Sequence, residues 1–102
     1  MKVRIRPEAW LDIEEAIHYL NEEDGGKTAV RFYRQVRRTL KDLSRQPGLG
    51  RPRRDLKPPG IRSWRVADPF QNWLIFYQIT EPGLEILRVK HGAVDLPALF
   101  ET

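Results

Sequence analysis

Few side chains in this sequence are suited to acid–base or nucleophilic chemistry, and they are widely spaced. The chain has two histidines, His18 and His91, and no cysteine, which excludes a cysteine nucleophile, cysteine metal ligands and disulfides. Neither histidine belongs to an HxxxH or HExxH pattern, so we expect no metal site and no cofactor. We interpret His18 as a surface residue. His91 is either an acid or base, or a strand-end side chain that hydrogen-bonds a nearby loop.

Charged residues are segregated along the chain. The net charge is +4, from 18 lysines and arginines against 14 aspartates and glutamates. Residues 8–24 contain seven acidic side chains and no basic one, whereas residues 27–45 contain seven basic side chains and one aspartate. Residues 51–65 contain six basic side chains against Asp55 alone. Because such segregation produces a field that steers acidic partners, the pattern predicts a basic surface for a macromolecule.

The first half of the chain predicts a strand followed by two helices. Apolar and basic residues alternate over residues 2–6, as in a strand with one buried face. Pro7 then suits the first position of a helix, which should end near the glycine pair Gly25-Gly26. The apolar face of this helix recurs at steps of three and four: Trp10, Ile13, Ile17 and Leu20.

The second helix should run from residue 27 to residue 46 and pack against the first as an antiparallel hairpin. Its bases follow steps of three and four, which places them on one stripe away from the apolar line. That stripe is either a solvated face, partly paired with acids of the first helix, or a docking surface. Its members are Lys27, Arg31, Arg34, Arg38, Lys41 and Arg45.

The second half predicts a loop and three strands. Residues 51–60 form a loop that its prolines stiffen, and Pro82-Gly83 fits the centre of a type II turn. A single helical turn is expected near residues 96–100. The expected strands are residues 62–66, 73–79 and 85–91.

These elements predict an α+β fold in the order β-α-α-β-β-β, with a helical hairpin packed on one face of a mostly antiparallel four-stranded sheet. The length suits one domain, residues 1–102. The longest apolar run, residues 73–77, is too short to span a bilayer. Because the N-terminus has no signal-peptide core, we expect a cytoplasmic protein.

Three stretches together resemble the ParE toxin family, within the ParE/RelE superfamily of bacterial type II toxin–antitoxin systems. The first is the helical hairpin followed by Pro47-Gly48-Leu49-Gly50-Arg51-Pro52. The second is Ile61-Arg62-Ser63-Trp64-Arg65-Val66, followed by Trp73-Leu74-Ile75-Phe76-Tyr77. The third is Ile86-Leu87-Arg88-Val89-Lys90-His91-Gly92, with Asp95-Leu96. The resemblance covers nearly the whole chain in the family's order and spacing.

The resemblance implies a toxin that binds DNA gyrase, stabilises its cleaved-DNA state and is neutralised by a cognate antitoxin. That antitoxin would be ParD-like, with an acidic C-terminal segment that folds on the toxin, and the toxin would meet DNA only indirectly, through the antitoxin. On this reading the chain is not an enzyme and has no catalytic residue. A third possibility is a non-toxic homologue that only binds an antitoxin.

RelE-like relatives instead cut messenger RNA on the ribosome, which requires a proton acceptor, cations for the phosphate and an acid. Leu74 stands where RelE-like sequences place an arginine at the start of a strand. As an endoribonuclease, the chain would depend on His91 for proton transfer. The cations available to help it would be Arg62, Arg65 and Arg88.

Two surfaces are therefore expected, one for each macromolecular partner. The proline-stiffened loop and the next strand have the better claim to the target, because stiff segments lose little entropy on binding. The expected target-binding residues are Arg51, Arg53, Arg54, Arg62, Arg65 and His91. Apolar helix residues belong to the core by default, but some can line a groove for a helical partner. The expected antitoxin-binding residues are Trp10, Ile13, Arg31, Arg34 and Arg38.

Overall fold

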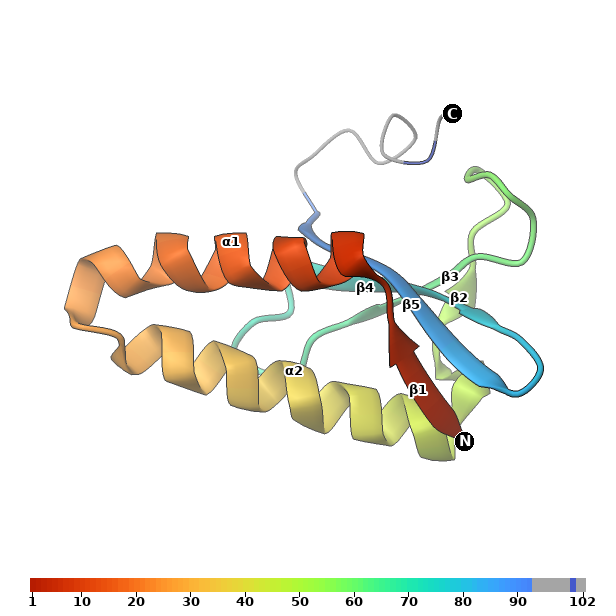
Figure 1. Ribbon diagram of the computed structural model, residues 1–102, viewed down its shortest axis with the longest axis horizontal. Coiled ribbons are helices and arrows are strands. Elements are labelled where there is room, and N and C mark those ends of the chain that lie inside the picture. Colours follow the sequence, from red (N-terminus) through yellow and green to blue (C-terminus); the bar gives the residue numbers. More distant parts are fainter. Residues whose placement is uncertain (93–99, 101–102) are drawn as a thin grey trace.

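The computed structural model describes residues 1–92 and residue 100. Figure 1 shows two long helices beside a twisted sheet, in the order that the sequence predicts. The first half comprises β1 (Lys2–Ile5), α1 (Pro7–Asp24), α2 (Lys27–Arg45) and a 3-10 turn, η1 (Pro47–Leu49). The second half comprises β2 (Arg51–Pro52), β3 (Arg62–Arg65), β4 (Trp73–Ile79) and β5 (Gly83–His91). Within the described residues, no helix is long and apolar enough to cross a membrane.

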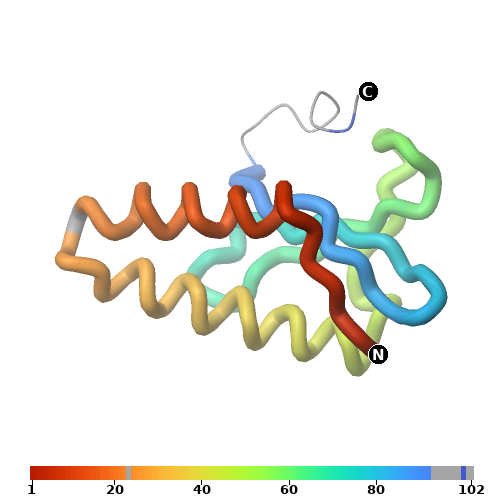
Figure 2. Tube along the Cα trace, in the orientation of Figure 1, coloured from red at the N-terminus to blue at the C-terminus, as the bar shows by residue number. Residues whose placement is uncertain are grey.

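The two helices form the expected antiparallel hairpin. Pro7 opens α1 after Arg6, whose extended backbone provides the N-cap without a side-chain hydrogen bond. The hairpin turn uses Gly25 and Gly26, with φ of 70° and 95°, a left-handed backbone that glycine adopts without steric cost. Figure 2 shows that this turn lies at the end of the molecule farthest from the β4–β5 hairpin.

The sheet contains one strand more than the sequence predicts. Within the described residues its order is β1-β5-β4-β3-β2, with β1 parallel to β5 and the other neighbours antiparallel. The added strand is β2, Arg51–Pro52, which lies in the segment predicted to be a loop and pairs with Arg62 and Ser63. A two-residue strand produces no alternating pattern, so the four-stranded prediction missed it.

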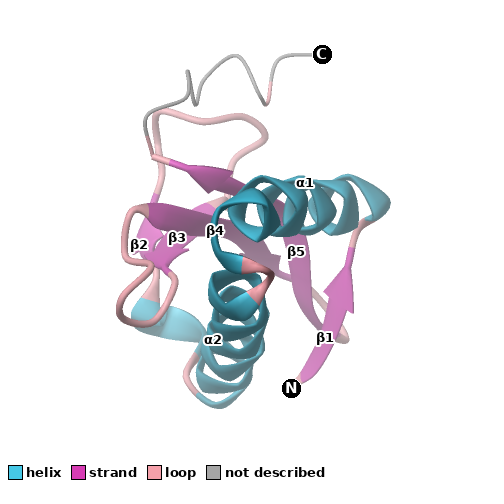
Figure 3. Ribbon diagram, turned by 90° about the vertical axis from the view of Figure 1, so that its left-hand side faces the viewer, coloured by secondary structure: helices cyan, strands magenta, loops and turns pink. Residues whose placement is uncertain are grey.

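Apolar side chains cover both faces of the sheet. The larger core lies between the sheet and the helices, which stand in front of the sheet in Figure 3. Its largest fully buried side chains include Phe32, Ile75 and Tyr77. A smaller core lies on the other face, where the loop between β2 and β3 buries Leu56 and Ile61 against Phe76 and Leu87.

The turn between β4 and β5 differs from the predicted type II turn. The Glu81–Pro82 peptide bond is cis, and Glu81-Pro82 occupies the centre of the turn, because the N–H of Thr80 donates to the carbonyl of Gly83 over 2.7 Å. Consequently β5 begins at Gly83, two residues earlier than expected. A Cβ at Gly83 would collide with the carbonyl oxygen of Lys2, so glycine lets β1 approach β5. The helical turn expected near residues 96–100 lies outside the described residues, apart from Phe100.

Candidate functional site

A buried carboxylate joins α1 to β5. Asp12 is 3% exposed and accepts two hydrogen bonds from the guanidinium of Arg88, from Nε over 2.8 Å and from Nη2 over 3.0 Å. It also accepts the backbone N–H of Val89 over 3.0 Å and lies 3.1 Å from Nζ of Lys90. Hydrogen bonding to the Asp12 carboxylate raises the pKa of Arg88 above its usual value. Arg88 is therefore committed to the helix–sheet junction.

His91 lies apart from the arginines named with it in the endoribonuclease hypothesis. Its ring meets Trp73 edge-on, with centroids 5.4 Å apart, and it lines a shallow groove beside the acidic face of α1. Because β4 separates β5 from β3, His91 and Arg65 lie two strand spacings apart, about 10 Å. Nη1 of Arg62 donates to the carbonyl of Gly50 over 2.6 Å. The structure thus does not assemble His91, Arg62, Arg65 and Arg88 into one site.

Arg53 is buried, contrary to its expected role as an exposed docking residue. Its side chain is 6% exposed and donates to both carboxylate oxygens of Asp55, over 2.9 Å and 2.7 Å. It also donates to Oγ of Ser63 and lies over the ring of Phe76, 5.7 Å from its centroid. The hydrogen bond from Arg53 lowers the pKa of Asp55 to about 2. This arginine fixes the loop to the sheet, and Asp55, the one acid in residues 51–65, is bound to it.

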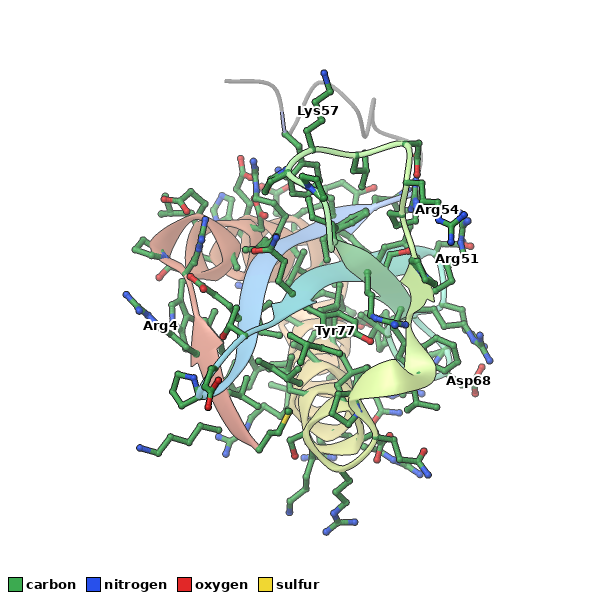
Figure 4. All side chains as sticks on the ribbon, turned by 90° about the vertical axis from the view of Figure 1, so that its right-hand side faces the viewer. Arg4, Arg51, Arg54, Lys57, Asp68 and Tyr77 are labelled. Atoms are coloured by element: carbon green, nitrogen blue, oxygen red, sulfur yellow. The ribbon has the colours of Figure 1, made fainter. Side chains whose placement is uncertain are left out.

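Three of the other expected target-binding arginines are exposed at the β2 edge. Arg51, Arg54 and Arg65 are all exposed, and Figure 4 shows Arg51 and Arg54 together at that edge, with Arg4 at the opposite edge. The guanidinium of Arg65 lies over the ring of Trp64, 4.5 Å from its centroid. Arg51 and Arg65 line a hollow of about 280 Å³, here called the cationic hollow. Its other lining residues are Arg53, Ser63, Trp64, Gln71 and Leu74.

A second concavity, here called the helix groove, lies between the hairpin and β1. It measures about 680 Å³, and its apolar residues come from α1, α2 and β1: Val3, Ile5, Trp10, Ile13, Tyr33, Val36 and Leu40. Trp10 is 42% exposed, whereas Ile13 is 2% exposed and contributes mainly to the core. Arg37, Arg38 and Lys41 bring positive charge to it.

The sequence indicated only part of this helix groove. Arg38 lines it as expected, whereas Arg31 and Arg34 are exposed on α2 without lining it. Sequence reasoning missed Arg37, which lies off the basic stripe and over the ring of Tyr33, 5.9 Å from its centroid. It also missed Gln71 in the cationic hollow, because a glutamine between two strands carries no pattern that could identify it.

The described ion pairs of the acidic helix α1 run to β5 and within α1 itself. In the part of the chain that the structure describes, carboxylates of α1 pair with Arg88 and Lys90 of β5, and with His18 of α1 itself. Over the same residues, the side chain of Glu23 left aside, no ion pair joins α1 to α2. The basic stripe on α2 is therefore available to a partner. This favours a docking surface over a solvated face that is paired with acids of the first helix.

Comparisons with known proteins agree with this architecture. The model of the family described as "ParE toxin of type II toxin-antitoxin system, parDE" matches residues 3–96. Toxin ParE3 of Caulobacter vibrioides is 30% identical over 96 residues, which cover 94% of this chain and 90% of that protein. A solved structure titled "Chromosomal ParDE TA system from P. aeruginosa" has the same fold, with a TM-score of 0.74 at 18% identity, over 89% of this chain and 95% of that chain.

The family match takes in the helix groove and the cationic hollow, since residues 3–96 include all of β1 except Lys2, the hairpin and all of β2 to β5. Membership of this toxin family implies an antitoxin partner. By the family match and the similarity to Toxin ParE3, this chain belongs to the ParE toxin family of type II toxin–antitoxin systems.

Proposed function

We propose that this chain inhibits DNA gyrase in the cytoplasm by binding it directly, and that an acidic antitoxin neutralises it. The observation that carries the proposal is the β2 edge, where Arg51, Arg54 and Arg65 are exposed. The one acid of that segment, Asp55, is bound to Arg53. A rigid, uncompensated cationic edge suits docking to an acidic macromolecule, because complementary charge accelerates association and fixes orientation.

The same geometry argues against RNA cleavage by this chain. Cleavage requires an acid–base group and cations around one phosphate, yet Arg88 is bonded to Asp12 and Arg62 to Gly50. His91 is left beside the acidic groove of α1, where a phosphate would be repelled. Leu74, in the cationic hollow, supplies no charge. Binding without chemistry on the target is the function that these contacts support best.

The helix groove is the proposed site for the antitoxin. An amphipathic helix would place its apolar face on Trp10 and its neighbours, and its acidic residues beside Arg37, Arg38 and Lys41. The unpaired α2 stripe extends this cationic surface to Arg31 and Arg34. Because the helix groove and the β2 edge involve different elements, neutralisation would not require the antitoxin to cover the target-binding residues.

Purified gyrase provides the test of the proposal. The chain should stop DNA supercoiling and leave gyrase covalently attached to broken DNA. The variant R51Q/R65Q should lose this inhibition, whereas R4Q, an equal change of charge per site at the opposite edge of the sheet, should retain it. His91→Gln keeps a hydrogen-bonding side chain but cannot transfer protons, so it should largely retain inhibition.

The alternatives predict different results. Messenger RNA cut on ribosomes by the wild type, but not by His91→Gln, with gyrase unaffected, would establish the endoribonuclease and overturn the proposal. A chain that folds, binds its antitoxin and leaves both gyrase and messenger RNA untouched would be the non-toxic homologue.

A further inference from the structure

The cationic hollow lies on the helix-free face of the sheet, at the boundary between β2 and β3. Arg51 pairs with Ser63 across the two strands, and Arg65 is two residues beyond Ser63. Arg51 and Arg65 are therefore diagonal neighbours on one face, with Cα atoms about 7–8 Å apart. Both side chains are exposed and line the same hollow of about 280 Å³. Two long cationic arms thus converge on a space of limited volume.

We infer that the cationic hollow binds the phosphodiester backbone of DNA, so that the toxin touches the DNA held by gyrase as well as the enzyme. The identification of that DNA rests on the proposed function. The affinity of the hollow for a DNA backbone rests on the hollow's own geometry. Contacts of this kind hold phosphate oxygens and carry no sequence preference.

The lining of the hollow fits a phosphate. It contains no carboxylate, and two of its three arginines, Arg51 and Arg65, are exposed, whereas Arg53 is paired with Asp55. Guanidinium groups bind phosphate oxygens through paired N–H donors. Arg65 is held in place by the ring of Trp64, so less side-chain entropy is lost when it binds. Gln71 and Ser63 supply neutral polar groups beside the cations. The apolar Leu74 contributes no charge that would repel an anion.

Further exposed cations continue from the cationic hollow along the β2 edge of the sheet. Arg54 is exposed next to Arg51, and Lys57 is exposed farther along the loop (Figure 4). Asp68 lies at the same side of the molecule in this view, but it does not line the hollow, and its carboxylate accepts the side-chain amide of Gln71 over 2.6 Å. A row of cations along an edge follows a charged polymer better than a single acidic side chain.

The β2 edge is also poorly suited to the other common use of a sheet edge, the addition of a partner strand. The strand has only two residues, and Pro52 has no N–H to donate. Short edges that carry proline and charge discourage strand pairing. An acidic protein surface remains the alternative partner, and the experiment distinguishes it from DNA.

The test measures binding of a fluorescent DNA duplex to the full chain by anisotropy, between about 50 and 200 mM salt. The wild type should bind with an affinity that falls steeply as salt rises. In R51Q/R65Q the slope of log affinity against log salt should become shallower by about 2, because two phosphate contacts are lost. R4Q, which removes a guanidinium from the opposite edge, should keep the wild-type slope.

Three outcomes distinguish DNA binding by the cationic hollow from its alternatives. An equal loss of slope per guanidinium removed, in R51Q/R65Q and in R4Q, would show diffuse attraction to a basic protein and overturn the inference. If R51Q/R65Q lost gyrase inhibition while the wild type bound no DNA, the hollow would meet a protein surface of gyrase, and only the DNA contact would be wrong. The expected DNA-binding pattern, with gyrase unaffected, would support the hollow as a DNA site while contradicting the proposed function.

Discussion

Tyr77 connects β4 to the turn that follows α2, at the base of the cationic edge. Its hydroxyl donates to the carbonyl of Pro47 over 2.7 Å and accepts the N–H of Gly50 over 2.8 Å. The side chain is fully buried, and burial raises the pKa of its hydroxyl. Because the carbonyl of Gly50 accepts from Arg62, this one phenol helps to set where β2 begins.

We expect Tyr77→Phe to fold but to lose about 1–3 kcal/mol of the free energy of unfolding, because two buried backbone groups lose their partner. Urea denaturation measures the loss. The neutral phenol is the form that the fold favours, so the stability it provides is complete below pH 10 and declines as the pH rises toward the folded-state pKa. Tyr77→Phe should lack this part of the alkaline decline. Wild-type stability in the variant would contradict the assigned hydrogen bonds.

Asp12 is the residue on which the junction between α1 and β5 depends. We expect Asp12→Ala to lower the free energy of unfolding by about 2–3 kcal/mol, because Arg88, Lys90 and the N–H of Val89 lose a charged acceptor. Glu15→Ala is the control on the same helix, since Glu15 is 76% exposed and pairs only with Lys90. It should change stability by less than about 1 kcal/mol. Equal effects of the two variants in urea denaturation would refute the assigned junction.

At the scale of elements, the sequence predicts the helices and strands that have a local apolar pattern. It misses a very short strand and the contacts between residues that are distant in sequence. Both helices and β3 follow apolar periodicities, and β4 is a continuous apolar run, and the structure confirms these elements. The strand β2 is too short to show a repeat, and the burial of the loop residue Leu56 depends on Phe76, which is distant in sequence. The pairing of Asp12 with Arg88 spans 76 residues, so no local pattern reveals it. That is why Arg88 remained a candidate for chemistry until the structure placed it.

The α2 helix carries the prediction for the antitoxin. We expect R38E/K41E to weaken antitoxin binding by at least about tenfold, because like charges would then face an acidic segment across the helix groove. Isothermal titration calorimetry with the cognate antitoxin measures the change. Both residues are exposed, so the fold should be unaffected. R4Q is a control outside the helix groove and should bind as the wild type does, and equal affinities for all three proteins would exclude this groove.

For the whole molecule, two cationic surfaces of the ParE fold involve different elements. The helix groove belongs to α1, α2 and β1, whereas the cationic hollow belongs to β2 and the residue after it, β3, β4 and the segment before β4. Among the described side chains, the carboxylates of α1 pair with β5, and Arg53 of the cationic hollow pairs with Asp55. The other arginines of the hollow and the basic residues of the helix groove are exposed. The sequence predicts two basic segments and assigns one to each partner, but it could not show that Arg53 is internal or that Arg37 reaches the helix groove.

The most direct test of the account measures gyrase inhibition and antitoxin binding side by side for R51Q/R65Q and R38E/K41E. The account predicts that R51Q/R65Q loses inhibition of purified gyrase and still binds the antitoxin. It predicts that R38E/K41E inhibits gyrase as the wild type does but is no longer neutralised by the same amount of antitoxin. If either variant lost both activities while remaining folded, or if R51Q/R65Q still inhibited gyrase fully, the assignment of two separate surfaces would be contradicted.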